Sequence, residues 1–238
     1  MSARVPDLEI AALDDVDITL APWRWPFAAA RRGDIDRHFA ELQGRRLGVW
    51  NGRVVLLHRY AIDGGVLRGA CFETDYASLC AWRDWTFPDP SVFNFFAAAA
   101  LCAADGAYLV GEMAADTAAA GLLYFPCGTP EPTDTDAAGK FDLTGNLRRE
   151  LKEEVGLDLD ALAVEPGWSL VRDRCYIGLL KRVTARESAT ELRDRILHNI
   201  AQDERPEFTA IRIVRSPADF DAAMPRFVTA YLEQVWRQ

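Results

Sequence analysis

Apolar residues recur at helical spacing most clearly in the second half of the chain. Leu143, Leu147, Leu151 and Val155 are four residues apart, which places them on one face of a helix. Gly156 follows directly, where helices commonly end in a left-handed residue. We therefore expect a helix that ends at Val155 and turns this stripe toward a core.

The segment before this helix has the pattern of a sheet. Residues 92–104 form a long, uncharged and mostly apolar string, which is typical of a buried central strand. Asp105-Gly106 then predicts a turn into a second strand at 107–113, and a further strand is expected at 122–125.

The segment after the helix alternates between strands and helices. Residues 161–170 and 175–183 are predicted strands, 189–201 a helix and 206–214 a late strand. An amphipathic helix is expected to close the chain.

A separate N-terminal module is expected over residues 1–90, because the Pro88-Asp89-Pro90 stretch has the composition of a boundary. Asn51-Gly52 between two apolar runs predicts a hairpin, and Asp63-Gly64-Gly65 predicts a second turn of a small antiparallel meander. Asp75 is expected to cap a helix. The candidate roles of this module are dimerisation, the shaping of substrate choice, or a purely structural extension.

Charge and cysteine usage narrow the function classes. The chain has 238 residues, of which half are apolar, and a net charge of −9 without a concentrated basic run. Binding to polymeric nucleic acid or an anionic membrane needs a basic footprint, so neither partner is expected. Five cysteines without metal-site spacing, no leader-like start and no long apolar segment predict a cytoplasmic protein with reduced thiols.

Three carboxylates project from the polar side of the predicted helix. Glu150, Glu153 and Glu154 are three and four residues apart, and like charges at this spacing destabilise a helix by roughly 0.2–0.5 kcal/mol per exposed pair. Arg149 offsets part of this repulsion. A divalent cation would offset the rest, because Mg²⁺ prefers carboxylate oxygens, waters and substrate phosphates. A solvated acidic helix face is the simpler alternative.

The same residues carry a resemblance to a known family. Arg149 to Leu157 reads R-E-L-K-E-E-V-G-L, which resembles the second half of the Nudix box, R-E-U-x-E-E-x-G-U, where U is aliphatic. The first half departs from the family pattern, because Thr135 and Phe141 stand where the pattern has glycine and glutamate.

A better match to the family's glycine turn lies upstream, in residues 123–131. Cys127 replaces the first glycine of the usual Pro-Gly-Gly, and about seven residues are inserted within 132–140, a segment of turn-rich composition. The glutamate of the first half is then either Glu131 or Asp142, or is absent.

The resemblance implies a fold and an activity. The fold is α/β: a Nudix-type α/β/α sandwich with a mixed sheet over residues 91–238, preceded by a small α+β N-terminal module. The implied activity is Mg²⁺-dependent hydrolysis, with Mn²⁺ as the alternative cation, of the diphosphate in a nucleoside diphosphate linked to another moiety. Such an enzyme is an acid anhydride hydrolase. Nucleotide sugars are the first candidates, while dinucleotides, coenzyme A derivatives and oxidised nucleotides remain open.

Roles for individual residues follow from the resemblance. Glu153 and Glu154 are the implied metal ligands, and Glu150 is either a ligand or the general base. Arg149 orients a carboxylate. The backbone carbonyl of Cys127 is a further candidate ligand.

Four residues outside the box are also candidates. Glu207 precedes the late strand, where the family often has a glutamate that helps the metal site, and Glu204 is the reserve; a lone surface acid is the alternative for both. Arg172 and Arg174 are candidates for holding substrate phosphate or ribose, and a charged hairpin turn is the alternative.

Two further functions remain open. A catalytically silent Nudix-like module that binds a nucleotide ligand as a sensor or scaffold would explain the altered first half of the box. A protein-interaction domain that uses the N-terminal module is the other alternative. The expected partners are a small-molecule nucleotide and a second copy of the chain in a homodimer.

Overall fold

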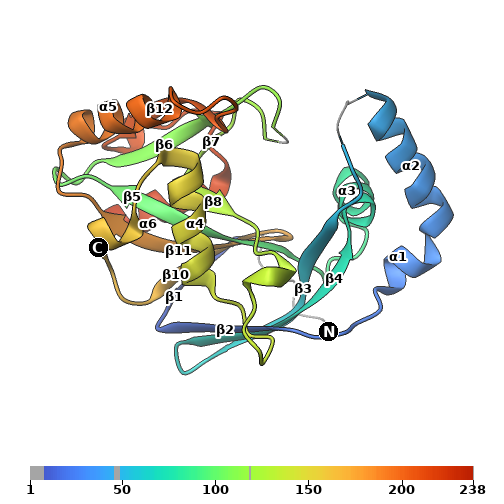
Figure 1. Cartoon of the computed structure of the whole chain (residues 1–238). Coiled ribbons are helices and arrows are strands. Elements are labelled where there is room, and N and C mark those ends of the chain that lie inside the picture. The colour runs from blue at the N-terminus through green and yellow to red at the C-terminus, as the bar shows by residue number, and fades with distance from the viewer. Residues whose placement is uncertain (1–7, 46–48, 118, 238) are drawn as a thin grey trace.

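The computed structural model describes residues 8–45, 49–117 and 119–237. Within these residues the chain forms two β-sheets. Figure 1 shows the larger sheet and its helices on one side of the molecule, and the smaller sheet with the N-terminal helices on the other.

The larger sheet is mixed, because one central pair of strands is parallel and the other paired neighbours are antiparallel. Its strands, in spatial order, are β1 (Leu8–Leu13), β10 (Trp168–Asp173), β11 (Tyr176–Thr184), β5 (Asn94–Cys102), β6 (Tyr108–Met113) and β12 (Phe208–Val214). Three two-residue strands lie beside them: β7 (Leu123–Tyr124) pairs with β6, β8 (Cys127–Gly128) with β5, and β9 (Ala163–Val164) with β11.

Strand β5 is the buried centre that its apolar sequence predicts, and β11 runs parallel to it along its whole length. Strands β5 and β6 pair at Cys102 and Tyr108 and then separate. Beyond this point β8 pairs with β5 and β7 pairs with β6. The separation therefore brings the Cys127-Gly128 turn against the middle of β5.

Helices cover both faces of the larger sheet. Helix α4 (Leu143–Val155) and helix α5 (Ala189–Ile200) pack on one face, and α6 (Arg226–Trp236) packs on the other. The expectation of an α/β fold with a mixed sheet between helices is confirmed. Three short 3₁₀ turns also occur in this part of the chain: Pro132–Asp134, Leu159–Ala161 and Pro217–Asp219.

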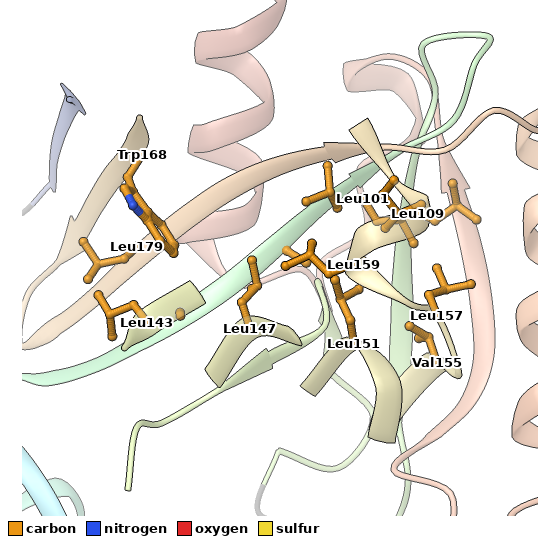
Figure 2. Packing of buried hydrophobic residues seen from close by; sticks show 14 of the residues in the cluster. Leu101, Leu109, Leu143, Leu147, Leu151, Val155, Leu157, Leu159, Trp168 and Leu179 are labelled. Atoms are coloured by element: carbon orange, nitrogen blue, oxygen red, sulfur yellow. The ribbon is translucent and has the colours of Figure 1, made fainter. Parts of the chain in front are cut away.

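The apolar stripe of α4 lies in the core, as its spacing predicts. Leu143, Leu147 and Leu151 are buried, and Figure 2 shows them directed toward the strands that carry Leu101 and Leu179. Each such leucine contributes roughly 1.5–3 kcal/mol through its removal from water. This packing fixes the rotation of α4 and therefore the direction of its opposite, acidic side.

The smaller sheet contains three strands in the order β2-β4-β3, with helices packed beside them. Its elements are β2 (Asp15–Leu20), α1 (Pro26–Ala30), α2 (Arg32–Arg45), β3 (Arg53–Asp63), β4 (Val66–Asp75) and α3 (Tyr76–Asp84). The predicted turn at Gly64-Gly65 joins β3 to β4, and both glycines have positive φ. Of the predicted antiparallel meander, the β3–β4 hairpin is correct, and the third strand of the sheet is β2, which was not predicted and runs parallel to β4.

The predicted hairpin at Asn51-Gly52 is wrong. The Oδ1 atom of Asn51 accepts a hydrogen bond from the N–H of Ala77, and the carbonyl of Gly52 accepts one from the N–H of Tyr76. These groups occupy free donors at the start of α3, so the dipeptide supports a helix terminus. Residues 47–48 of the predicted first strand lie outside the described residues.

The predicted strand over residues 161–170 is also wrong in its extent. The chain forms a 3₁₀ turn and the short β9, and β10 begins only at Trp168. Gly167 has a φ of +69°, which interrupts an extended strand at this point.

The two sheets share the beginning of the chain. Strand β1 pairs along β10 of the larger sheet, and after Asp14 alone the chain continues as β2 of the smaller sheet. The boundary near residue 90 stays a prediction. Among the described residues, no helix is long and apolar enough to cross a membrane.

Candidate active site

Helix α4 has well-defined ends on both sides of the acidic cluster. The Oδ1 atom of Asp142 accepts a hydrogen bond from the N–H of Gly145 at 2.8 Å, which caps the first turn. Gly156 has a φ of +68° and ends the helix in the left-handed conformation that its position predicts. The register of the glutamates between these caps is therefore fixed.

Glu154 is the most deeply buried carboxylate of α4, with 6% of its surface exposed. Its Oε2 atom accepts a hydrogen bond from the backbone N–H of Cys127 at 2.8 Å. Burial raises the pKa of Glu154 well above its usual value, and the negative charges of Glu207 and Glu150 raise it further. The hydrogen bond from Cys127 lowers the pKa but does not outweigh these effects. An ionised carboxylate here needs a positive partner.

Glu150 lies against the turn of β8, and its side chain is 13% exposed. Its Oε1 atom forms an ion pair with Arg149 at 2.8 Å and accepts a hydrogen bond from Asn146 at 3.5 Å. Burial raises the pKa of Glu150 to about 7, with neighbouring acids adding to the effect and Arg149 opposing it. A Cβ atom at Gly128 would collide with the Glu150 carboxylate, so only glycine allows this approach.

Arg149 contacts three carboxylates at once. Besides Glu150, it reaches Oε2 of Glu153 at 3.5 Å and Oδ2 of Asp134 at 3.3 Å. The side chain of Glu153 is 61% exposed, so this member of the cluster faces solvent. The guanidinium thus holds acids from α4 and from the preceding loop in one arrangement.

Two residues of this network carry no signal in the sequence motif. Asn146 is 1% exposed and donates to both Asp134 and Glu150, while its buried Oδ1 atom makes no hydrogen bond within the described part of the chain. Asp134 belongs to the inserted segment. The sequence offered only the spacing of Asn146, four residues before Glu150 on the same helix face, as a clue.

The two acids considered for the first half of the box have other contacts. Asp142 is the N-cap of α4, and Glu131 caps the 3₁₀ turn that begins at Pro132. The acid that reaches Arg149 and Asn146 is instead Asp134.

Glu207 lies directly before β12, and its carbonyl accepts a hydrogen bond from the N–H of Ala114 at 2.7 Å. The side chain of Glu207 is exposed, but desolvation by neighbouring groups and then the charge of Glu153 raise its pKa. Its charge in turn acts on Glu150 and Glu154, so the structure brings it to the acidic cluster. Glu204, the reserve, is exposed on the preceding loop.

The donor set fits a hard divalent cation. In the described ranges, no three histidine, cysteine or acidic side chains converge closely enough to form a metal cage by themselves. The cluster does supply carboxylate oxygens and the unpartnered amide oxygen of Asn146, and Mg²⁺ commonly binds one or two carboxylates and completes its shell with waters and phosphates. The backbone carbonyl of Cys127 stays a predicted ligand.

The structure does not bring Arg172 and Arg174 into this cluster. Arg172, 2% exposed, donates from Nε to Oε2 of Glu9 at 2.9 Å. Arg174 is exposed in the two-residue turn between β10 and β11, with a φ of +55°. Both line a different cavity, together with Tyr60 and Phe87.

Comparison with known proteins gives only distant structural likenesses. No protein-family model matches the chain, and no curated protein matches it. Similar solved structures include the Nudix hydrolase RenU from M. smegmatis, with 15% identity over 61% of this chain and 89% of that one and a TM-score of 0.39. A MutT protein from Methanosarcina mazei has 13% identity over 61% and 94%, with a TM-score of 0.41.

A mutant of the pyrophosphohydrolase BsRppH from Bacillus subtilis has 11% identity over 79% of this chain and 97% of that one, with a TM-score of 0.37. All three identities are at most 15% and all three TM-scores are below 0.5. These likenesses do not assign an activity to the chain.

Proposed function

We propose that this chain is a Mg²⁺-dependent hydrolase that cleaves the diphosphate of a nucleoside diphosphate linked to another moiety. The observation that carries the proposal is a pair of glutamates on the R-E-x-x-E-E helix, of which Glu154 is buried and Glu150 is largely shielded from solvent. Glu150 and Glu154 both have raised pKa values because they are buried near other acids. Such a costly arrangement is typical of a functional site that a cation completes.

The side chains support a division of roles. One or two of the candidate ligands Glu153, Glu154 and Glu207 would hold the cation, with waters and substrate phosphates completing its shell. The cation would supply Lewis-acid stabilisation of the phosphate charge and lower the pKa of the attacking water. Glu150, with its pKa of about 7, is suited to accept the proton of that water. Arg149 fixes Glu150 through the 2.8 Å contact.

The reaction is a hydrolysis in which one bond forms and one breaks. The water oxygen bonds to one phosphorus of the diphosphate, and the bond from that phosphorus to the bridging oxygen breaks. The bridging oxygen leaves with the other phosphate. The products are a nucleoside monophosphate and the phosphorylated second moiety.

A cavity beside the cluster supports a nucleotide substrate. It has a volume of about 580 Å³ and begins at Cys127, whose N–H binds Glu154. The rings of Tyr124, Tyr176 and Phe227 line it, and aromatic faces of this kind accept a flat base. Nucleotide sugars remain the first candidates within this class.

The test is cleavage of the diphosphate bond across a panel of nucleoside diphosphate derivatives, with Mg²⁺ and again with EDTA. Cation-dependent release of a nucleoside monophosphate is the expected result. Replacement of Glu154 by glutamine, which keeps the side-chain shape, should reduce turnover by at least about 10²-fold, as loss of a charged catalytic group does. Glu41→Gln on the exposed face of α2 is the matched control and should leave turnover unchanged.

Equal turnover by the Glu154→Gln variant would contradict the assignment of this residue. Binding of a nucleotide ligand without cation dependence and without any product would instead favour the silent sensor.

A further inference from the structure

A second cavity lies where the smaller sheet meets the β10–β11 turn. Its volume is about 650 Å³, and it is distinct from the cavity that begins at Cys127. Both parts of the molecule that Figure 1 separates contribute to its wall. The residues that matter are Arg59 and Tyr60 from β3, Phe87 after α3, Phe93 before β5, and Arg172 and Arg174 from β10 and its turn.

The charge of this cavity is positive although the chain carries a net charge of −9. Arg59 and Arg174 are exposed, and neither makes an ion pair with any residue that the structure describes. The acids near this cavity already have partners. Glu9 pairs with Arg172 at 2.9 Å and accepts a hydrogen bond from the Tyr60 hydroxyl at 3.3 Å. Asp89 accepts hydrogen bonds from Trp25 and Ser91. Two guanidinium groups therefore remain for an anion, and their planar donors match phosphate oxygens.

Aromatic rings form the other part of the wall. The guanidinium of Arg174 lies 5.4 Å from the ring centre of Phe87, and the rings of Tyr60 and Phe93 meet edge to face at 5.4 Å. Rings beside arginines are the combination that binds a base together with its phosphate.

Backbone strain is concentrated around the same cavity. Among the described residues, Thr86, Phe87 and Arg174 are the non-glycine residues with positive φ, at +64°, +57° and +55°, and all three line this cavity. Strain of this kind is characteristic of ligand-binding sites.

The position of Thr86 shows how unusual this loop is. The N–H of Phe87 bonds to the carbonyl of Trp82 and that of Thr86 to the carbonyl of Arg83, which is the Schellman pattern at the end of α3. Thr86 occupies the left-handed position where glycine is usual, and a β-branched residue is unfavourable there. The loop keeps this conformation and thereby presents Phe87 to the cavity.

We propose that this cavity is a nucleotide-binding site, with phosphate between Arg59 and Arg174 and the base against Phe87. Arg172 orders the wall through Glu9. The choice of a nucleotide as ligand rests on the proposed function, whereas the anion site rests on the arginines themselves. The nucleotide has two sources: the distal half of a substrate whose diphosphate lies at the carboxylate cluster, or a separate effector molecule.

The test measures binding without catalysis. Calorimetric titration uses the Glu154→Gln protein in EDTA, with ADP, pyrophosphate and adenosine as probes. We expect ADP to bind more tightly than either pyrophosphate or adenosine, since each lacks one half of the recognised group. The double variant Arg59→Ala/Arg174→Gly should weaken ADP binding at least 10-fold, and glycine suits the positive φ at residue 174.

Arg68→Ala is the matched control, since Arg68 is an exposed arginine of the same small sheet that pairs with Asp63 outside this cavity. Its ADP affinity should equal that of the parent. A thermal melt of each variant establishes that it is folded. No ADP binding by the parent, or equal binding by the double variant, would overturn the proposal.

Steady-state kinetics with Mg²⁺, in protein that retains the wild-type Glu154, then separate the two sources of the nucleotide. If the double variant raises KM for the hydrolysed substrate at least 10-fold, the cavity holds the distal half of that substrate. If KM is unchanged while ADP binding is lost, the ligand is a separate effector. ADP binding in EDTA that depends on Arg59 and Arg174 does not require hydrolysis of any compound in the panel. The nucleotide site and the hydrolase function can therefore be refuted independently of each other.

Discussion

Gly128 determines how closely the Glu150 carboxylate approaches strand β8. Residues outside the sequence motif thus shape the acidic cluster. Asn146 positions two of its carboxylates by donating hydrogen bonds to Asp134 and to Glu150. The sequence identified the charged residues of α4, since their spacing is local. It did not identify Asp134, because only the folded path of the inserted loop brings that acid to Arg149.

The first residue-level prediction concerns Gly128→Ala. The added methyl group should push the Glu150 carboxylate away from β8 and reduce kcat by about 10²-fold, the effect typical of a 1 Å misplacement at an active site. Steady-state kinetics with Mg²⁺ on the substrate found in the panel would measure this.

Gly33→Ala serves as the control, since no heavy atom lies within 4 Å of the added group on the exposed side of α2. It should leave kcat unchanged and stabilise the protein by at most about 1 kcal/mol, since Gly33 lies in the first turn of α2. Normal kcat in Gly128→Ala would show that the position of Glu150 does not limit the reaction.

At the scale of the elements, local patterns predicted the centre of the larger sheet and helices α4 and α5, but not the first two strands of the chain. The residues of β2 alternate between polar and apolar, Asp15-Val16-Asp17-Ile18-Thr19-Leu20, so a strand signal was present and was missed. Strand β1 has no such alternation. Its identity comes from pairing with β10, more than 150 residues away in the sequence, which no local pattern contains.

The element-level prediction concerns the N-cap of α3. The Oδ1 atom of Asp75 accepts a hydrogen bond from the N–H of Ser78 at 2.8 Å, and its Oδ2 atom forms an ion pair with Arg32 at 2.7 Å. Burial alone would raise the pKa of Asp75, but these contacts outweigh it and lower the pKa. Asp75→Ala should therefore lower the free energy of unfolding by about 0.5–2 kcal/mol at pH 7.

The lowered pKa of Asp75 sets the direction of the pH effect. The carboxylate stabilises the fold above its unfolded pKa, and this contribution is lost as the pH falls through the folded value. Urea denaturation from pH 7 to pH 3 should show the wild-type and Asp75→Ala proteins becoming more alike below about pH 4. Asp36→Ala, which also removes an Arg32 contact but caps no helix, should change stability by less than about 0.5 kcal/mol.

At the scale of the whole molecule, the buried acids of α4 make stability depend on the cation. Ile18 and Leu57 of the smaller sheet belong to the same hydrophobic cluster as Phe95 of the larger one, so the molecule has a shared core beneath this site. A cation that binds only the folded chain stabilises it by about 2.7 kcal/mol when present at 100 times its Kd.

The whole-molecule prediction compares melting temperatures in EDTA and in Mg²⁺ at pH 8. The wild-type protein should melt at a higher temperature with Mg²⁺, and Glu154→Gln should lose most of this gain. In EDTA the Glu154→Gln variant should melt at a higher temperature than the wild-type protein. The fold raises the pKa of Glu154, so the ionised carboxylate destabilises the folded state at pH 8, and the neutral glutamine does not. A gain of 1 kcal/mol corresponds to about 2–4 °C. A variant less stable than the wild type in EDTA would indicate that the carboxylate is already compensated by protein groups.

Only Asp14 separates β1 of the larger sheet from β2 of the smaller sheet, and this limits how the chain can be truncated. Cutting the chain near residue 90 would remove β1 together with the smaller sheet, and the edge of β10 would lose its pairing partner. Unpaired edges of this kind recruit strands from other molecules and lead to aggregation. A fragment intended to isolate the catalytic part would therefore have to retain residues 8–13, supplied as a separate peptide or joined by circular permutation.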